Sequence, residues 1–312
     1  MESRTLERQI FTSHTALSLE DDRNRPNVPT FEPKKEKNLT KHALMPVGDS
    51  ELRARVRWGH ATSAHFALSF DADIFHPNET KTLLAMLESR YHQIFALTHE
   101  TFTDRMTVYA VDLRSPSLLG RSARTHFNLA ERTIYLIRSG VDAFDVELTQ
   151  ALVHAMRFSR CIKHYGITSG WAMLEDAFAV FISERLRENH KVFPFFGVEP
   201  NLVIHFLLER SAVRLLSYLW ESRQFASPLE RYVVAGAFLL YLGDALGDDK
   251  IINFSRIDDE VLSGTFRDFF GESLVNLEER WFEHLPRTLV TFTEEERTSS
   301  LNEWLQVSTG KF

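Results

Sequence analysis

The apolar residues in the first half of the chain follow two different periods. Residues 65–70 alternate between apolar and polar positions as in a strand, and residues 106–111 and 132–137 are predicted as two further strands. Residues 125–128 are a candidate hairpin partner for the third strand. Between the first two strands, residues 79–97 carry leucines and aromatic residues at helical spacing, so a helix is expected there.

After Val141 the apolar positions follow the helical period almost throughout. The resulting order, strand–helix–strand–strand followed by helices, predicts an α+β fold in one continuous domain. We expect a small, mostly antiparallel sheet and a helical C-terminal half. Helices are predicted at 144–165, 171–189, 198–221, 228–246, 248–254, 261–270 and 273–285.

Two terminal segments lie outside this pattern. Residues 1–55 combine charge with four prolines and keep no period of 2 or 3.6, so they predict a flexible N-terminal arm. Residues 291–312 are interpreted as a C-terminal tail. The folded domain is therefore expected over residues 56–290.

Composition and charge exclude several classes of protein. The chain has 312 residues, of which 44% are hydrophobic and 25% charged, as in soluble globular proteins. A net charge of −7 gives no overall case for binding nucleic acid or an anionic membrane. A single cysteine excludes an intrachain disulfide framework, and the first residues lack the apolar core of a secretory signal. We expect a cytoplasmic protein without a nucleic-acid or membrane partner; the sequence leaves the oligomeric state open.

The most informative segment runs from residue 148 to 186 and has the spacing of a zinc-peptidase core without its reactive groups. An H-E-x-x-H helix places two histidines on one face, where both reach one Zn²⁺, and its glutamate is the general base. His154 stands at the first histidine, Ala155 at the glutamate and Phe158 at the second histidine. Alanine cannot accept a proton and phenylalanine cannot donate a lone pair to zinc. The sequence thus predicts neither a bound metal nor a cofactor.

Further segments follow in a consistent order: A-H-F-A-L-S-F, L-E-S-R-Y-H, M-T-V-Y-A-V and R-T-I-Y-L before the motif, and W-A-M-L-E-D-A-F-A-V-F and T-F-R-D-F-F-G-E-S-L after it. In this order the chain resembles the peptidase MA-like domain, a gluzincin-type zinc metallopeptidase fold, over roughly residues 60–287. The resemblance implies a zincin-like architecture. It also implies that the segment beginning at Trp171 is similar to the family's helix that carries the third, acidic ligand.

The resemblance leaves the identity of the third-ligand acid open. Aligning A-F-A-V-F with the family's G-x-A-x-Y selects Asp176, whereas counting from Trp171 selects Glu175. An acid without zinc needs another partner, because a buried carboxylate alone is costly, and His154 or Arg157 is the nearest candidate. Phe158 is expected to fill space near the lost metal. The residues that the resemblance places in the cleft are Ala155, Arg157, Phe158, Cys161, His164 and Trp171.

Replacement ligands close to the motif look poorly placed. Cys161 follows His154 by seven residues, about 10 Å along a helix axis, with Phe158 between them. His164 is farther still and rotated off that face. Cys161 and His164 could touch as a nucleophile pair, although a lone cysteine is usually inert core. No other nucleophile, phosphate-loop or dinucleotide motif is present.

These observations favour a catalytically degenerate metallopeptidase-like protein, a pseudopeptidase, which binds a peptide, protein or small molecule in the former active-site groove. Two alternatives remain open at this level. One is an enzyme with metal-independent chemistry that reuses His154, Glu175 or Asp176, and His164. The other is an active zinc metallopeptidase with an unusual ligand set.

Overall fold

The computed structural model describes residues 57–112, 125–138, 144–161, 169–187, 200–209, 215–221, 230–257, 262–289, 293–295 and 297–299. The chain divides into two units, Met1–Met45 and Pro46–Phe312, and every described residue lies in the second. The predicted arm at 1–55 and most of the predicted tail at 291–312 therefore lie outside the described residues.

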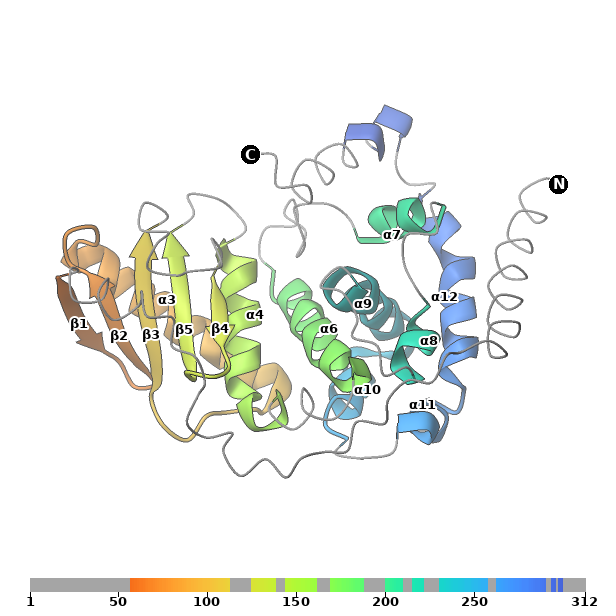
Figure 1. Ribbon diagram of the computed structural model, residues 1–312, viewed down its shortest axis with the longest axis horizontal. Coiled ribbons are helices and arrows are strands. Elements are labelled where there is room, and N and C mark those ends of the chain that lie inside the picture. Colours follow the sequence, from red (N-terminus) through yellow and green to blue (C-terminus); the bar gives the residue numbers. More distant parts are fainter. Residues whose placement is uncertain are drawn as a thin grey trace, which may run out of the picture. The chain divides into compact units, whose positions relative to one another are not determined.

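The described residues of the first half form a five-stranded mixed sheet with the order β1-β2-β3-β5-β4 (Figure 1). The outer pairs β1–β2 and β4–β5 are antiparallel, whereas β2–β3 and β3–β5 are parallel. The α+β class is confirmed, but the expectation of a mostly antiparallel sheet is wrong for its centre. The strands are β1 (Trp58–Thr62), β2 (Phe66–Asp71), β3 (Met106–Asp112), β4 (His126–Asn128) and β5 (Thr133–Arg138).

The helix α3 (Pro77–Thr98) explains the parallel centre of the sheet. It joins β2 to β3 and packs against β2, and a helical crossover returns the chain to the same edge, so that the next strand runs in the same direction. Pro77 stands in its first turn, and the Glu79 carboxylate accepts a hydrogen bond from the His76 backbone N–H at 2.9 Å. The helix ends at His99, which adopts a left-handed conformation with φ 50°.

The strand β1 was not predicted from the sequence. None of its five residues is buried, and the polar His60 and Thr62 are exposed, so the apolar alternation is too weak to predict a strand. Gly59 lies against the ring of Phe70 in β2: a Cβ there would be 2.4 Å from that ring, which would have to move. The aromatic ring thus covers the position where β1 has no side chain.

The second half of the described chain is helical, as predicted, with three local differences. The segment predicted as one helix at 144–165 is interrupted by a turn at Arg157, the segment at 198–221 holds two helices, and the segment at 228–246 begins with a π-helix, η3. The elements are α4 (Phe144–Met156), α6 (Ser169–Arg185), α7 (Pro200–Glu209), α8 (Leu216–Glu221), η3 (Glu230–Val234), α9 (Ala235–Leu246), α10 (Asp248–Phe254), α11 (Leu262–Phe270) and α12 (Leu274–Leu289).

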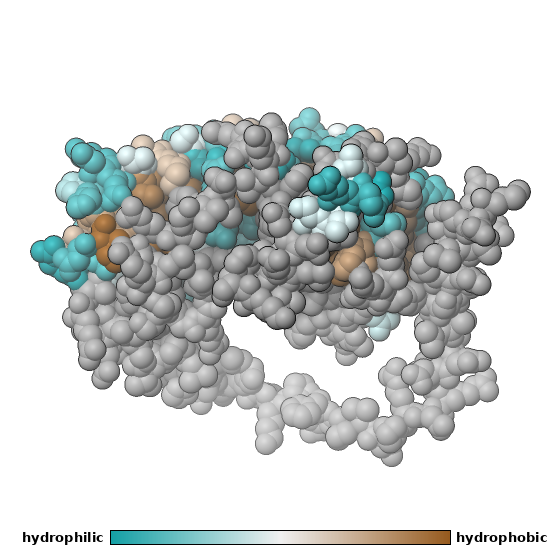
Figure 2. All heavy atoms as spheres, turned by 90° about the horizontal axis from the view of Figure 1, so that it is seen from above, coloured by the Kyte–Doolittle hydropathy of each residue, from teal (hydrophilic) through white to brown (hydrophobic). Residues whose placement is uncertain are grey.

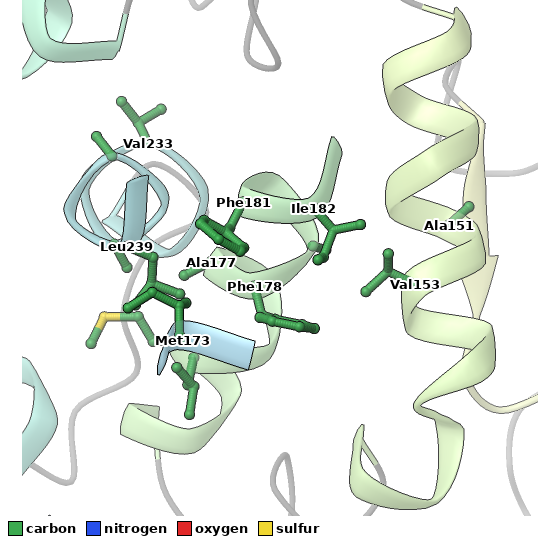
Figure 3. Close-up of a cluster of buried hydrophobic side chains, with 14 of the residues drawn as sticks. Ala151, Val153, Met173, Ala177, Phe178, Phe181, Ile182, Val233 and Leu239 are labelled. Carbon is green, nitrogen blue, oxygen red and sulfur yellow. The ribbon is translucent and has the colours of Figure 1, made fainter. Parts of the chain in front are cut away.

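The helix α6 lies at the centre of this helical half. It contacts α4, α8, η3 and α9, and every residue from Ala172 to Ser183 is buried. Figure 3 shows its Phe178, Phe181 and Ile182 within the hydrophobic core. Gly236 allows α9 to approach α6 closely, since a Cβ there would lie 2.7 Å from a methyl group of Val180. A helix buried on all sides must supply a partner for each polar side chain that it carries.

The described surface carries both hydrophilic and hydrophobic side chains. Figure 2 shows hydrophilic and hydrophobic residues next to one another among the coloured atoms. The large exposed hydrophobic residues are Phe95, Leu97, Tyr218 and Val275. Single residues of this kind are ordinary on a protein surface. Within the described chain, none of the helices combines the length and the hydropathy that crossing a membrane requires.

Candidate functional site

The helices α4 and α6, which carry His154 and the two acids Glu175 and Asp176, face each other. Figure 3 shows Val153 of α4 pointing toward α6, where Ile182 and Phe178 lie nearest to it. Phe158 is half-buried. The buried apolar residues of these two helices include Leu152, Val153, Met156, Leu174, Phe178 and Phe181. This contact sets the positions of the polar residues that the two helices bring together.

The first polar pair in the site joins Arg157 to Glu175. The Arg157 Nε donates a hydrogen bond to one Glu175 carboxylate oxygen at 2.7 Å, and Nη2 donates to the other at 2.9 Å. Both side chains are buried, with exposed fractions of 1% and 0%. This two-point geometry is the strongest form of an arginine–carboxylate interaction. Glu175 is therefore held by Arg157, one of the two partners proposed for it from the sequence.

The remaining donors of Arg157 are also used. Nη2 donates to the Ser255 carbonyl oxygen at 2.8 Å, and Nη1 donates to a Glu100 carboxylate oxygen at 3.2 Å. The guanidinium carbon lies 4.5 Å from the centre of the Phe178 ring. Burial alone would lower the pKa of Arg157, but the charge and hydrogen bonds of Glu175 outweigh it and raise that pKa. The arginine thus stays charged inside the protein.

The second acid, Asp176, is the one that faces His154. One Asp176 oxygen lies 3.6 Å from His154 Nε2, and the other lies 3.2 Å from Nε of Arg231 in η3. Burial raises the pKa of the neighbouring Tyr232, and the charge of Asp176 and a hydrogen bond to it raise that pKa further. Asp176 is therefore surrounded by an imidazole, a guanidinium and a phenol. The two adjacent acids, which the sequence could not separate, have different partners.

The imidazole of His154 is neutral in this environment. Burial lowers its pKa more than the charges of Asp176 and Glu175 raise it. Its Nε2 is buried without a hydrogen-bond partner within the described part of the chain, because 3.6 Å to Asp176 exceeds hydrogen-bond range. His154 and Asp176 are thus near each other without forming a charged pair.

This environment predicts a pH dependence of stability. In the unfolded chain His154 takes up a proton near the ordinary histidine pKa of 6.5, while burial lowers that pKa and keeps the ring neutral in the folded protein. The unfolded state then binds more protons, so the free energy of unfolding falls as the pH drops below 6.5. When the pH is lowered from about 7.5 to about 5.5, we expect the free energy of unfolding to fall less in His154→Gln than in the unmodified protein. Urea unfolding at each pH measures it. The exposed histidine variant His284→Gln is the control and should follow the unmodified protein; equal losses in all three proteins would contradict the prediction.

Cys161 lies closer to His154 than the sequence argument allowed. Its Sγ is 3.9 Å from His154 Nδ1 and 3.7 Å from a Glu175 oxygen, to which the thiol donates. The expectation that Phe158 would separate the two side chains is therefore wrong. The Cα–Cβ bond of Cys161 tilts toward the helix N-terminus and the imidazole is long, so together they span the axial rise. Burial and the charge of Glu175 raise the thiol pKa, which leaves no nucleophilic thiolate.

The other residues predicted in the cleft have separate positions. Phe158 packs edge-to-face on Phe127 of β4, with a 6.0 Å separation of ring centres, and the Arg132 guanidinium lies 4.4 Å above its ring. Ala155 is buried and offers no polar group. His164 and the side chain of Trp171 lie outside the described residues.

Sequence reasoning missed four partners that complete the site. Glu100 and Ser255 contact Arg157, and Arg231 and Tyr232 contact Asp176. No motif or spacing connects them with the helices α4 and α6. The one available local signal is structural: Arg231 and Tyr232 lie in a π-helix, and short π-helical turns are frequent at functional sites.

The arrangement leaves few groups that could bind a metal between α4 and α6. His154, Asp176 and Cys161 remain as ligands by type, but Asp176 also contacts Arg231 and Tyr232, and burial raises the pKa of the Cys161 thiol. Catalytic zinc sites use three protein ligands and structural ones four.

Comparisons with protein-family models, curated proteins and solved structures found no match. The interpretation of the site therefore depends on its own residues.

Proposed function

We propose that this chain is a pseudopeptidase of zincin-like, gluzincin-type architecture, which binds an extended peptide beside α4 without cleaving it. The observation that carries the proposal is that an arginine lies against each of the two acids that are candidates for the third ligand, Glu175 and Asp176. Arg157 binds Glu175 at two points, and Arg231 lies 3.2 Å from Asp176. A guanidinium thus supplies the positive charge that zinc would bring to a carboxylate in an active enzyme.

The exchange of a metal for arginine also accounts for the residues of the motif. With Ala155 in place of the general base and Phe158 in place of a ligand, two acids would remain in a buried helix with no cation. Buried charges without partners are strongly destabilising, so the site requires a permanent cation. Arginine fulfils this requirement because it stays protonated at every physiological pH.

The geometry of the sheet supports a peptide as the ligand. The strand β4 is at the edge of the sheet, and its outer side has no strand partner among the described residues. It contacts α4, which lies beside it in Figure 1. Its Phe127 packs on Phe158. An edge strand can pair its backbone with an extended segment of another chain. A peptide added to β4 would therefore lie beside the segment that carries His154 and Phe158.

The proposal predicts that zinc binding is absent at His154 and can be rebuilt. We expect the triple variant Ala155→Glu, Phe158→His, Arg231→Leu to bind about one additional zinc ion, since it has two histidines, a base and a released Asp176. Zinc is measured by elemental analysis after dialysis, and the same protein with His154→Ala is the control. A folded triple variant without additional zinc would contradict the zincin-like frame. Zinc bound by the unmodified protein and lost on His154→Ala would contradict the pseudopeptidase.

Peptide binding is tested separately with fluorescein-labelled casein peptides. Saturable binding without cleavage is expected, measured by fluorescence polarisation and gel electrophoresis. Replacing Phe127 in β4 by proline should weaken it, because the ring of proline removes a backbone donor from the strand. Cleavage that persists in EDTA and disappears in His154→Ala would instead favour the metal-independent enzyme.

A further inference from the structure

Two histidines and a glutamate meet where α3 packs against the start of β2. His65 directly precedes β2, and Glu88 and His92 are four residues apart on α3, one turn from each other. The three side chains have exposed fractions of 30%, 19% and 64%, so the group is half-buried and open on the His92 side. None of these residues belongs to the site between α4 and α6.

Glu88 is the centre of this group. One of its oxygens accepts a hydrogen bond from the His65 backbone N–H at 2.8 Å. The other oxygen lies 2.7 Å from His65 Nδ1 and 3.9 Å from His92 Nε2. A single carboxylate oxygen is therefore shared by two imidazole rings that come from different elements of the fold.

We propose that His65, Glu88 and His92 bind a divalent transition-metal ion of the zinc type. Two imidazoles and one carboxylate form a ligand set that zinc, copper, nickel and cobalt accept, whereas magnesium and calcium prefer oxygen ligands. The ligand atoms of these three side chains all lie within 4.8 Å of one another. Among the histidines, cysteines and acids of the described chain, they are the three that meet this condition. Three protein ligands and a water molecule would complete a tetrahedral site.

The spacing of the ligand atoms suits a single ion. Two atoms bound to the same tetrahedral zinc at about 2.1 Å lie roughly 3.4 Å apart. The observed separations of 2.7 and 3.9 Å fall on either side of this value. His92 is the most exposed of the three, so its ring can turn toward the ion without disturbing the core.

The two less exposed ligands are already fixed in position. The His65 ring stacks on Tyr91 with ring centres 4.1 Å apart, and its backbone N–H orients the Glu88 carboxylate. Tyr91 is itself buried in the hydrophobic core. Because these contacts already hold His65 and Glu88 in place, metal binding costs less conformational entropy. Because the site joins β2 to α3, a bound ion would stabilise the folded state by mass action.

Zinc titration of the full chain after EDTA treatment tests the site. We expect about one zinc ion per chain to bind, measured by isothermal titration calorimetry, and His92→Ala to weaken this binding at least about 100-fold, since losing even a supporting residue of a metal site costs 10–100-fold. His92→Cys, which restores a ligand atom, should recover much of the affinity. With cobalt in place of zinc, the d–d absorption of a tetrahedral site provides an independent readout in each protein.

The control is His284→Ala. Like His92, His284 is an exposed helical histidine, and each ring lies 5.3 Å from one tyrosine ring, Tyr91 for His92 and Tyr241 for His284. His284→Ala and His154→Ala should both bind zinc as the unmodified protein does. The proposal is overturned if the unmodified protein shows no saturable binding, if His92→Ala binds with unchanged affinity, or if His154→Ala is the variant that loses it. Of these three results, only a loss of zinc binding in His154→Ala would also contradict the proposed pseudopeptidase function.

Discussion

Replacing Arg157 by methionine is expected to lower the free energy of unfolding by about 3–5 kcal/mol. The substitution keeps much of the side-chain volume but leaves the buried Glu175 carboxylate without the cation that binds both of its oxygens. It also removes the donors to Ser255 and Glu100. Urea unfolding followed by circular dichroism measures the change, with the unmodified protein at the same pH as reference.

Two further variants separate the charge effect from packing. Arg157→Met combined with Glu175→Leu removes both charges, and it should recover most of the lost stability, because a buried ion pair adds little over an apolar pair of similar size. Arg157→Lys keeps the charge but not the two-point contact, so an intermediate loss is expected. If the double variant is less stable than Arg157→Met alone, the explanation by an uncompensated carboxylate is wrong.

Phe178→Ala is expected to destabilise the protein by about 3–5 kcal/mol, the range for truncating a buried phenylalanine. Phe178 is fully buried in α6, lies beside Phe181 and Val153 in Figure 3, and its ring covers the Arg157 guanidinium. The variant removes contacts in the hydrophobic core, and it also removes the ring that covers the guanidinium of the Arg157–Glu175 ion pair. Its effect is measured by the same urea unfolding.

The matched control for this prediction is Phe95→Ala in α3. The Phe95 side chain is 41% exposed, so its truncation should cost well under half as much. Phe178→Leu should also cost less than Phe178→Ala, because it leaves a smaller cavity. Equal losses for Phe95→Ala and Phe178→Ala would show that α6 does not form the centre of the core.

The sequence predicted the helices better than the sheet for a physical reason. Helical spacing of apolar residues reports one buried face, and it located α3 and α6 to within a few residues and α4 at its start, Phe144, but not at its end. A period of two reports that a strand has a buried face but not which way its neighbour runs. The parallel centre of the sheet depends on the crossover through α3, and β1 depends on Phe70 covering Gly59. Neither relation is visible in a local pattern.

In the candidate site, too, relations between residues close in sequence could be predicted, whereas relations between distant segments could not. Arg157 was one of the two partners predicted for an acid in α6, because it follows the facing helix α4 directly and is only 18 positions from Glu175. Glu175 and Asp176 could not be separated, since adjacent residues on a fully buried helix point about 100° apart and each side has its own neighbour. Arg231 and Ser255 come from segments far along the chain, and tertiary contacts alone bring them there.

The contacts of Arg157 also constrain the order in which the chain acquires its structure. Its partners stand 18, 57 and 98 positions away, on both sides of it in the sequence. During synthesis from the N-terminus, Glu100 and Arg157 leave the ribosome long before Ser255. Closing so long a segment costs more entropy than forming a local helix, so the ion pair reaches its full set of hydrogen bonds only after α10 has docked. The complete hydrogen-bond network of Arg157 is thus a late product of folding.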